Sequence, residues 1–501
     1  MALRKRKRLL TGLFLFVAVI GAFLARPSWH ILTTILNDEN HIEERAPGFT
    51  NDASRLNKTP IAEFWQIPVE SDQPVKQLTE LLERARSEGK RVSIAGARHS
   101  MGGHTIYPGG IVIDTLPWNQ MKLNEEKTLL TVQSGAVWAD ILDYLEPLGC
   151  SVAVMQSNNS FTVGGSISVN CHGWQFGRPP IASTVESFRM MTADGTLLRC
   201  SRTENEELFS LALGGYGLFG IILDVELRIV PNQRYRLQQR MVPVAEAIET
   251  FEKKVRTLPD VEMVYARMNV VPDSFLMDVI INAHIQEEGE IPKLTEPGMQ
   301  RLKRAVFRGS ARNDYGKKLR WDAETKIQPL LAGEVFSRNQ LLNDGVNLYQ
   351  NRSAENTDIL HEYFIPEKHL VGFVQSMREI IPKHNGNLLN VTVRSVRTDH
   401  DTFLRYAKQP LIAFVLLFVQ EKNTAAEKRM QTMARELIDA ALQRDGCYYL
   451  PYRLHATLEQ FQAAYPMAPE FFERKRFYDP DELFQNEFYL KYGKSPAQIR
   501  D

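Results

Sequence analysis

Three glycine-rich segments, each beside a predicted strand, constrain the fold of this chain more than any other feature. They are Ala95–Gly103 (AGARHSMGG), Thr162–Gly173 (TVGGSISVNCHG) and Gly214–Ile222 (GGYGLFGII). Successive backbone N–H groups in a turn of small residues can cradle an anion, and paired glycines let the backbone approach a flat ligand closely. The first segment is neither a G-x-G-x-x-G nor a Walker motif. Any one alone is typical of a structural turn, but three in the same half of the chain predict a large, phosphate-bearing cofactor.

The pattern of apolar residues around these segments predicts alternating helices and strands. Helices are expected at 75–88 and 138–148, and strands at 91–95, 110–114, 129–133 and 221–230. Residues 185–191 and 197–200 are expected to form a hairpin around the Asp194-Gly195 turn.

The segment 235–445 has a different pattern. Predicted helices (243–256, 366–381, 424–443) alternate with predicted strands (260–269, 274–283, 388–396, 411–419). This order favours an antiparallel sheet backed by helices, and residues 286–350, rich in charge, are expected to leave the sheet as a long excursion. A chain of 501 residues is too long for one ordinary domain, so a second domain is expected here.

Composition excludes several classes of protein. Hydrophobic residues make up 44% and charged residues 24% of the chain, which are globular proportions. The formal net charge is zero, which argues against nucleic acid as the main partner. Four cysteines (150, 171, 200 and 447) and scattered histidines have no metal-ligand spacing, so no metal site is predicted, while one incidental disulfide stays open.

The N-terminus carries the one strong local charge asymmetry. A basic run, Arg4–Arg8, is followed by the apolar stretch Leu9–Ala25 and then Arg26-Pro27. This pattern favours an uncleaved membrane anchor within residues 1–30, with a cleaved signal peptide and a buried core helix as alternatives. The positive-inside rule places everything after residue 30 outside the cytoplasm, anchored to the membrane or exported if the segment is cleaved.

The order of the glycine motifs resembles a known family. The chain resembles the FAD-binding (PCMH-type) domain of the vanillyl-alcohol oxidase type. The motifs that carry the resemblance are, in order, a strand, G-x-x-His-Ser, a second strand, S-G-A, T-V-G-G ending in His-Gly, and G-x-G-x-x-G. Aldonolactone and alditol oxidases, cytokinin dehydrogenases and decaprenylphosphoryl-ribose oxidase share this domain. Tyr449–Tyr452, Phe461–Pro466 and Asp479–Asn486 resemble the family's C-terminal segment, so the likeness covers about residues 50–235 and 385–495.

The resemblance implies an α+β fold in three parts. A two-lobed FAD-binding domain is expected at 45–235, and a substrate domain, with an antiparallel sheet backed by helices, at 236–445. Residues 446–501 are expected to return to the FAD-binding domain.

The resemblance also implies cofactor roles residue by residue. The FAD pyrophosphate would lie against Gly96, Ala97, Arg98, His99, Ser100 and Met101. The isoalloxazine and ribityl side would lie against Gly135, Thr162, Val163, Gly164, Gly165, Ser168, Asn170, His172 and Gly173. The adenine half would meet Gly217, Gly220 and Ile222, and Tyr449 would lie close to the flavin. A histidine at the place of His99 bonds covalently to the flavin in some relatives, with a hydrogen-bonding turn residue as the alternative.

Catalysis in this family is hydride transfer from substrate to flavin N5. In sugar-type oxidases a Glu-Val-Arg triplet and a later lysine act on the substrate; here the triplet is Thr392-Val393-Arg394 and the lysine position falls on Tyr452. Arg394 and Tyr452 are therefore the predicted catalytic residues, with Arg453 or His455 as substitutes if the loop shifts. Tyr452 could act as acid and base if Arg394 or Arg453 lowers its pKa. The alternatives are a salt-bridged strand arginine and a core tyrosine.

The leading hypothesis is an FAD-dependent oxidoreductase acting on an alcohol-type substrate, either a sugar, a polyol or a lipid-linked molecule. Its electrons would pass to oxygen or to a membrane quinone. Two alternatives stay open: a flavin-dependent reductase of an unsaturated, sterol-like substrate, and a non-catalytic flavin-fold module.

Overall fold

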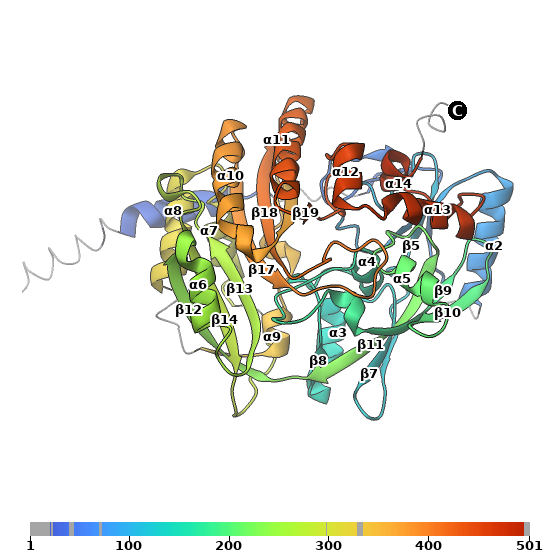
Figure 1. Ribbon diagram of the computed structural model, residues 1–501, viewed down its shortest axis with the longest axis horizontal. Helices are drawn as coiled ribbons and strands as arrows, with labels where there is room; N and C mark the ends of the chain where they lie inside the picture. Colours follow the sequence, from blue (N-terminus) through green and yellow to red (C-terminus); the bar gives the residue numbers. More distant parts are fainter. Residues whose placement is uncertain are drawn as a thin grey trace, which may run out of the picture.

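The first lobe is built on two sheets, seen on the right of Figure 1. The computed structural model describes residues 21, 24–39, 45–69, 73–296, 298–327 and 334–494. The smaller sheet is parallel, in the order β3 (Glu63–Gln66), β5 (Ile111–Asp114), β4 (Val92–Ala95). Helix α2 (Pro74–Ser87) lies where the sequence predicts it and buries Leu78, Leu81, Leu82 and Ala85.

The second sheet of this lobe has the order β10-β9-β11-β7-β6, and β8 pairs with β11. Its strands are β6 (Met121–Leu123), β7 (Leu129–Gln133), β8 (Cys150–Val152), β9 (Val185–Met191), β10 (Leu197–Ser201) and β11 (Ile221–Pro231). The predicted hairpin forms between β9 and β10, and Gly195 adopts a φ of 87° in its turn. Three helices accompany the sheet: α3 (Trp138–Leu145), α4 (Val163–Ser168) and α5 (Glu206–Ala212). Helix α3 stops earlier than expected because Glu146–Leu148, which contains Pro147, forms a 3-10 turn.

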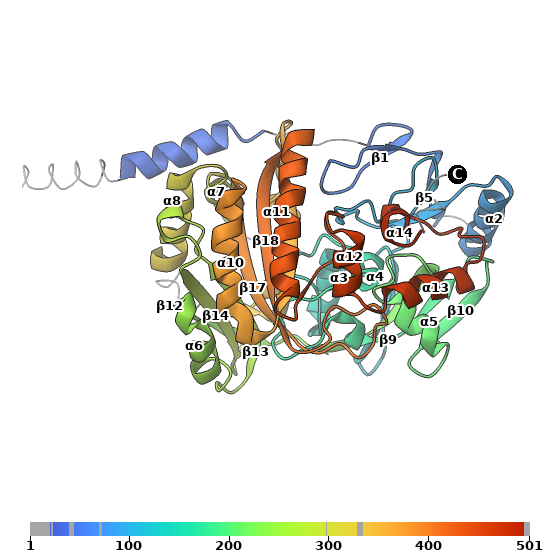
Figure 2. The same cartoon turned by 45° about the horizontal axis from the view of Figure 1, so that its top comes forward.

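The second lobe is an eight-stranded antiparallel sheet in the order β15-β12-β14-β13-β17-β18-β16-β19. Its strands are β12 (Arg234–Pro243), β13 (Val261–Met268), β14 (Asp278–Gln286), β15 (Val335–Ser337), β16 (Asn356–Ile365), β17 (Leu388–Val396), β18 (Leu411–Glu421) and β19 (Cys447–Tyr448). Helices α6 (Ala247–Lys254), α10 (Leu370–Lys383) and α11 (Thr424–Leu442) cover one face of it (Figures 1 and 2). The predicted α+β class, with an antiparallel sheet backed by helices, is confirmed.

Three features of this lobe differ from the prediction. Strands β12 and β16 were not expected, and β14 begins at Asp278 because Pro272–Ser274 form a 3-10 turn. The excursion 286–350 contains α7 (Gln300–Arg308), α8 (Asp314–Asp322) and α9 (Arg338–Leu342). These short helices bury Arg304, Arg320 and Arg338, so their inward faces do not have an apolar period.

The C-terminal residues pack against the first lobe. Helices α12 (Leu458–Ala464), α13 (Ala468–Tyr478) and α14 (Glu487–Tyr492) lie beside it in Figure 1. The backbone N–H of Val92 donates to Leu483 O at 2.8 Å, and Gln485 N donates to Val92 O at 2.9 Å. The end of the chain therefore extends the hydrogen bonding of β4. All four cysteines are free and buried.

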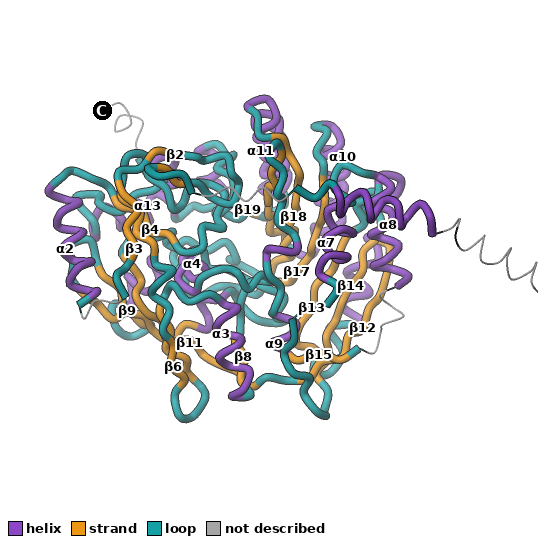
Figure 3. Tube along the Cα trace, turned by 180° about the vertical axis from the view of Figure 1, so that it is seen from behind, coloured by secondary structure: helices purple, strands orange, loops and turns teal. Residues whose placement is uncertain are grey.

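The N-terminal residues that can be described begin with a helix over 24–36, drawn across α7 and α8 in Figure 3. Strands β1 (Phe49–Thr50) and β2 (Thr59–Pro60) follow it. The expected anchor, Leu9–Ala25, lies almost wholly outside the described residues. Within the described ranges, no helix has both the length and the apolar character needed to cross a bilayer.

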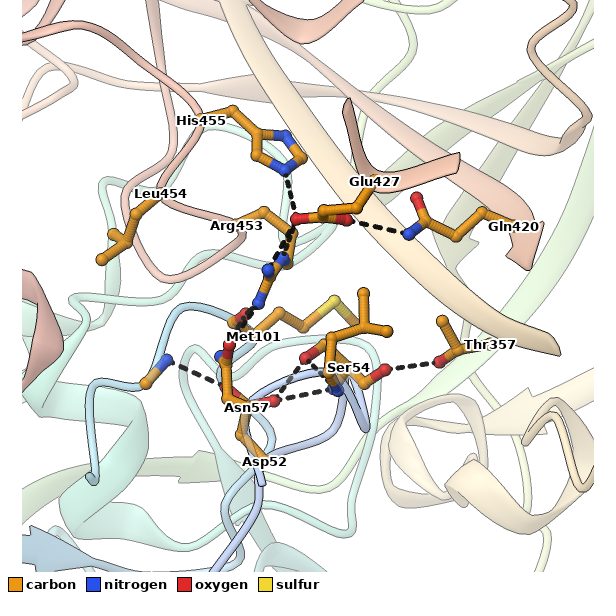
Figure 4. A network of polar contacts seen from close by, with 12 residues as sticks. Asp52, Ser54, Asn57, Met101, Thr357, Gln420, Glu427, Arg453, Leu454 and His455 are labelled. Carbon is orange, nitrogen blue, oxygen red and sulfur yellow. Dashed lines mark hydrogen bonds and ion pairs between the residues drawn. The ribbon is translucent and has the colours of Figure 1, made fainter. Parts of the chain in front are cut away.

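A polar network fastens the segment 52–57 to the rest of the molecule (Figure 4). Asp52 accepts hydrogen bonds from Asn57 Nδ2 at 2.6 Å and from Gly103 N at 2.9 Å. Arg453 Nη1 donates to Asn57 Oδ1 at 2.7 Å, and Arg453 Nη2 donates to Glu427 Oε1, on α11, at 2.6 Å. The N-terminal segment, the first glycine loop, the C-terminal loop and the second lobe are thus joined at one place.

Glu427 is the anion of this network, and it also lies 2.9 Å from His455 Nε2. Burial acts to raise the pKa of the Glu427 carboxyl, but the hydrogen bond with His455 and the charge of Arg453 outweigh burial and hold the pKa well below its usual range. We expect Glu427→Gln to lower the free energy of unfolding by about 3 kcal/mol at pH 7, because Arg453 loses its counter-charge. Urea unfolding of both proteins measures this.

The decrease in the free energy of unfolding caused by Glu427→Gln should depend on pH. A carboxyl with a depressed pKa stabilises the fold above its unfolded pKa of about 4.3 and loses that contribution as the pH falls toward its folded pKa. The difference between the two proteins should therefore shrink below about pH 4.3. Glu421→Gln is the matched control, because Glu421 pairs with Arg312 at the exposed surface and should contribute little. An equal loss for both variants would contradict the assignment.

Candidate functional site

The three glycine segments meet in the first lobe. A Cβ on Gly96 would lie 2.1 Å from Thr162 Oγ1, and a Cβ on Gly135 would lie 1.7 Å from Thr115 O. Tyr216 N donates to Ser168 O at 2.9 Å, which joins the third segment to the second. The close approach explains why glycine is needed at 96 and 135, and it brings the predicted cofactor residues into one region.

Each glycine segment also contains one non-glycine residue in the left-handed region: Arg98 (φ 55°), Asn170 (φ 47°) and Tyr216 (φ 54°). Such residues cost free energy and cluster at ligand sites. The side chain of Asn170 is held by the protein, since its Nδ2 donates to Asp399 Oδ2 at 2.9 Å and its Oδ1 accepts from Ala182 N at 3.1 Å. Asn170 therefore shapes the loop, and its amide is already satisfied by protein groups.

A cavity of about 640 Å³ lies where the first glycine loop faces the second lobe. The predicted site residues that line it are Ala97, Arg98, His99, Met101, Arg394 and Tyr452. The other predicted residues are not part of its lining: Gly96, Ser100, Gly135, Thr162, Val163, Gly164, Gly165, Ser168, Asn170, His172, Gly173, Gly217, Gly220, Ile222 and Tyr449. The structure thus brings together the predicted histidine, tyrosine and arginine from three distant parts of the chain.

Unsatisfied polar atoms at the glycine segments fit an anionic cofactor. Arg98 Nη1, Ser100 Oγ and Ser134 Oγ are buried without a hydrogen-bond partner among the described residues. Buried polar groups normally have partners, so three such atoms in one region mark a place for a ligand that accepts hydrogen bonds. The diphosphate of FAD is such a ligand, and Arg98 adds a positive charge. The residues present fit FAD.

His99 lines the cavity, with its ring centroid 4.2 Å from that of Phe161. Burial lowers the pKa of His99 to about 4, although a hydrogen bond with the backbone of Ser160 opposes this. The imidazole is therefore neutral at pH 7, and it keeps a nitrogen lone pair that can act as a nucleophile or accept a hydrogen bond.

Tyr452 belongs to a buried chain of polar groups. Its hydroxyl donates to Glu362 Oε2 at 3.2 Å, and Glu362 Oε1 lies 2.5 Å from His172 Nε2. The side chains of His172 and Glu362 are 4% and 2% exposed, and His172 Nδ1 has no partner in the described part of the chain. Three groups that can carry a proton are thus connected from the cavity inward.

Glu362 was missed by the sequence analysis. It lies on β16, where alternate residues Thr357, Ile359, His361 and Tyr363 are buried, a period-two pattern that could have indicated the strand. In sugar-type oxidases the position of Thr392, on β17, is a glutamate. In this chain Glu362 supplies a carboxylate two strands away, because β17, β18 and β16 are neighbours in that order.

The condition set for Tyr452, a pKa lowered by Arg394 or Arg453, is not met. Burial, and then the negative charge of Glu362, raise the pKa of its hydroxyl well above the usual value, although Arg394 opposes them. Tyr452 is therefore a protonated donor at neutral pH. Arg453 and His455 are both bound to Glu427, and neither lines the cavity.

Arg394 projects from β17 into the cavity and donates from Nη2 to Ser157 Oγ. Its Nε is buried without a partner among the residues described, as is Nε1 of Trp174 on the same wall. Burial lowers the pKa of the Arg394 guanidinium, and the carboxylate of Glu362 opposes that shift. Tyr265, Arg267, Asn390 and Thr392 also line this wall, and Asn390 bonds to both Arg267 and Thr392. The two unpartnered N–H groups, Arg394 Nε and Trp174 Nε1, are the donors that the wall offers to a hydroxyl-rich ligand.

Tyr449 lies away from the cavity. Its hydroxyl donates to Val169 O at 2.9 Å, and its ring lies 6.0 Å from that of His172. It packs behind the second glycine segment, next to the inner end of the polar chain.

Comparison with known proteins agrees with this geometry. A family model described as "FAD binding domain" matches residues 73–201, which contain the first two glycine segments. L-gulonolactone oxidase of Bos taurus is 28% identical over 212 residues, 42% of this chain and 47% of that protein. D-arabinono-1,4-lactone oxidase of Yarrowia lipolytica is 28% identical over 212 residues, 40% of this chain and 38% of that protein. Cytokinin dehydrogenase 2 of Arabidopsis thaliana is 33% identical over 133 residues, 26% of each chain.

The aligned stretches span less than half the length of each of these relatives. The family match, the two-sheet first lobe and the antiparallel second lobe agree with one another. Residues 73–201 of this chain therefore match an FAD binding domain, and the lactone oxidases and cytokinin dehydrogenase are its distant relatives.

Proposed function

We propose that this protein is an FAD-dependent oxidoreductase that removes a hydride from a carbon bearing a hydroxyl group, in a sugar- or lactone-type substrate. One observation carries the proposal. The Tyr452 hydroxyl, linked to Glu362 and close to Arg394, shares a cavity with His99 of the cofactor loop. The lactone oxidases among the relatives support this substrate class.

The side chains of the cavity have separate tasks in this proposal. Bound FAD supplies the acceptor for the hydride. Arg394, Asn390 and Thr392, on one face of β17, would hold the substrate hydroxyls and orient the reacting carbon.

The hydroxyl of the reacting carbon must lose its proton as the hydride leaves. Glu362 is within hydrogen-bond reach of Tyr452, so that proton would pass to the Tyr452 oxygen while Tyr452 gives its own proton to Glu362. His172, on the other oxygen of Glu362, would share the proton. The raised pKa of Tyr452 makes it a relay that stays protonated.

Oxygen and a membrane quinone are both proposed as electron acceptors, and a lipid-linked substrate stays a prediction. Location outside the cytoplasm also stays a prediction. The open donors of the Arg394 wall favour an alcohol-type substrate over an unsaturated, sterol-like one.

The first test concerns a covalent bond between His99 and the flavin, which the neutral imidazole in the cavity makes chemically possible. We expect the purified protein to be yellow and to keep its flavin absorbance in the pellet after acid precipitation. His99→Ala should release the flavin to the supernatant. Absorbance of the two fractions measures the result.

His104→Ala is not a suitable control, because His104 is buried in the core next to Phe488. His369→Ala is suitable, since it changes a partly exposed histidine far from the cavity. Flavin released from the unmodified protein would keep the FAD site but make His99 a non-covalent contact. A colourless protein that takes up no FAD would contradict the proposed function itself.

The second test concerns Tyr452. We expect Tyr452→Phe to lower the rate of flavin reduction by about 100-fold, because the substrate proton loses its relay. The rate is measured without oxygen, by the loss of flavin absorbance after mixing with L-gulonolactone or D-arabinono-1,4-lactone.

Tyr492→Phe is the matched control, since the Tyr492 hydroxyl donates to Ala456 O, away from the cavity. Glu362→Gln should slow the reaction as Tyr452→Phe does, and the double variant should be little slower than either, because the two groups act as one unit. Reduction of the Tyr452→Phe variant at the unmodified rate would contradict the relay.

A further inference from the structure

The helix over residues 24–36 exposes apolar side chains along one face. Trp29 is 68% and Leu36 is 73% exposed, and Leu32 lies between them on the same face at helical spacing. Leu24 and Ile35 are exposed as well. A row of large apolar residues on a free helix face marks an interaction surface.

The opposite face of this helix holds it to the protein through polar contacts. His30 Nε2 lies 3.0 Å from Gly309 O, at the end of α7, and the guanidinium of Arg26 lies 4.0 Å over the ring of Tyr315 on α8. Just beyond the helix, Asp38 accepts two hydrogen bonds from Arg304, at 2.6 and 2.7 Å. Folding therefore uses the polar face and leaves the apolar face for another partner.

The helices beneath it are basic, although the whole chain has no net charge. Helix 24–36, α7 and α8 together contain two acidic residues, Asp314 and Asp322. The basic residues of the same three helices are Arg26, Arg301, Lys303, Arg304, Arg308, Lys317, Lys318 and Arg320. Arg304, Arg308 and Arg320 are paired with Asp38, Asp358 and Glu324, and Lys318 lies 3.4 Å from Asp322. The exposed basic residues Arg301 and Lys303 of α7 therefore provide most of the positive charge at this surface. Apolar side chains with a tryptophan, on a basic support, are typical of a helix that lies in the surface of an anionic bilayer.

We propose that the free face of helix 24–36 lies on an anionic lipid bilayer, with α7 and α8 providing positive charge around it. Trp29, Leu32 and Leu36 would enter the headgroup region, where tryptophan is favoured. The helix directly follows the apolar stretch Leu9–Ala25 in the sequence, so both features would place this end of the protein at a membrane. The surface does not depend on the chemistry proposed for the cavity.

Residues of α7 connect this surface to the cavity. Arg304, which holds Asp38, also donates from Nη1 to Gln350 O at 2.8 Å, and Gln350 lines the cavity. Phe307, on the same helix α7, lines it too. Figure 2 shows helix 24–36 and β1 along one edge of the molecule, over both lobes. A bilayer on this face would lie next to one wall of the cavity.

A fluorescent probe on the free face tests the proposal with the full chain. The four native cysteines are buried, so Leu36→Cys can be labelled selectively with an environment-sensitive dye. With vesicles of phosphatidylcholine and phosphatidylglycerol, we expect the emission to shift to the blue and to be quenched by lipids that carry a nitroxide. Vesicles of phosphatidylcholine alone should give a smaller shift.

Phe477→Cys, on α13 of the other lobe, is the matched control, because Phe477 is equally exposed (69%) and its probe should not respond. Adding Leu32→Asp to the labelled Leu36→Cys protein should abolish the shift, whereas adding Leu458→Asp should not. A Leu36 probe that stays in water while the protein is bound to the vesicles would overturn the proposal. So would a shift that appears without vesicles as the protein concentration rises, which would assign the face to a second copy of this chain.

Discussion

The closest backbone contacts of the first lobe determine the geometry of the whole site. Gly96 and Thr162, and likewise Gly135 and Thr115, approach so closely that no side chain fits between them. These contacts press the loop after β4 against the turn before α4 and the loop after β7 against the loop after β5. In the same loops Arg98 and Asn170 adopt left-handed conformations, and His99 lines the cavity. The cavity lies where the sheet of the second lobe faces this loop.

The two faces of the second-lobe sheet have different neighbours. Helices α6, α10 and α11 cover one face, and the side chains toward them include the buried apolar residues Val391, Phe414 and Ile359. The residues between them, among them Asn390, Thr392 and Arg394 on β17, are free to be polar. Because successive side chains of a strand point to opposite faces of the sheet, residues that line the cavity alternate with residues that pack against the helices.

The same argument explains how far the sequence predicted the structure. Strands β7 and β17 were predicted to the residue, because their alternation is regular. The glycine motifs predicted the FAD-binding region that the family model matches. Strand β16 was missed because Asp358, His361 and Glu362 are polar residues in its apolar pattern, yet each has a hydrogen-bond partner, in Arg308, Tyr363 and His172. The missed strand carries the carboxylate next to Tyr452, so the family comparison found the tyrosine without its partner. Burial, and then Glu362, raise the pKa of Tyr452, and no local pattern around residue 452 contains either cause.

The packing of the C-terminal segment against the first lobe has a consequence for how the chain folds during synthesis. Met101 N, in the cofactor loop, donates to Pro451 O at 2.8 Å, and β4 is bordered by Leu483 and Gln485. The cavity also needs Tyr452, from the last tenth of the chain. The first lobe is synthesised early, but its cofactor loop lacks these neighbours until almost all of the chain has been made. The cofactor loop can therefore reach its final geometry only after residues 451–485 have been made, and a product that ends before them would have an incomplete site.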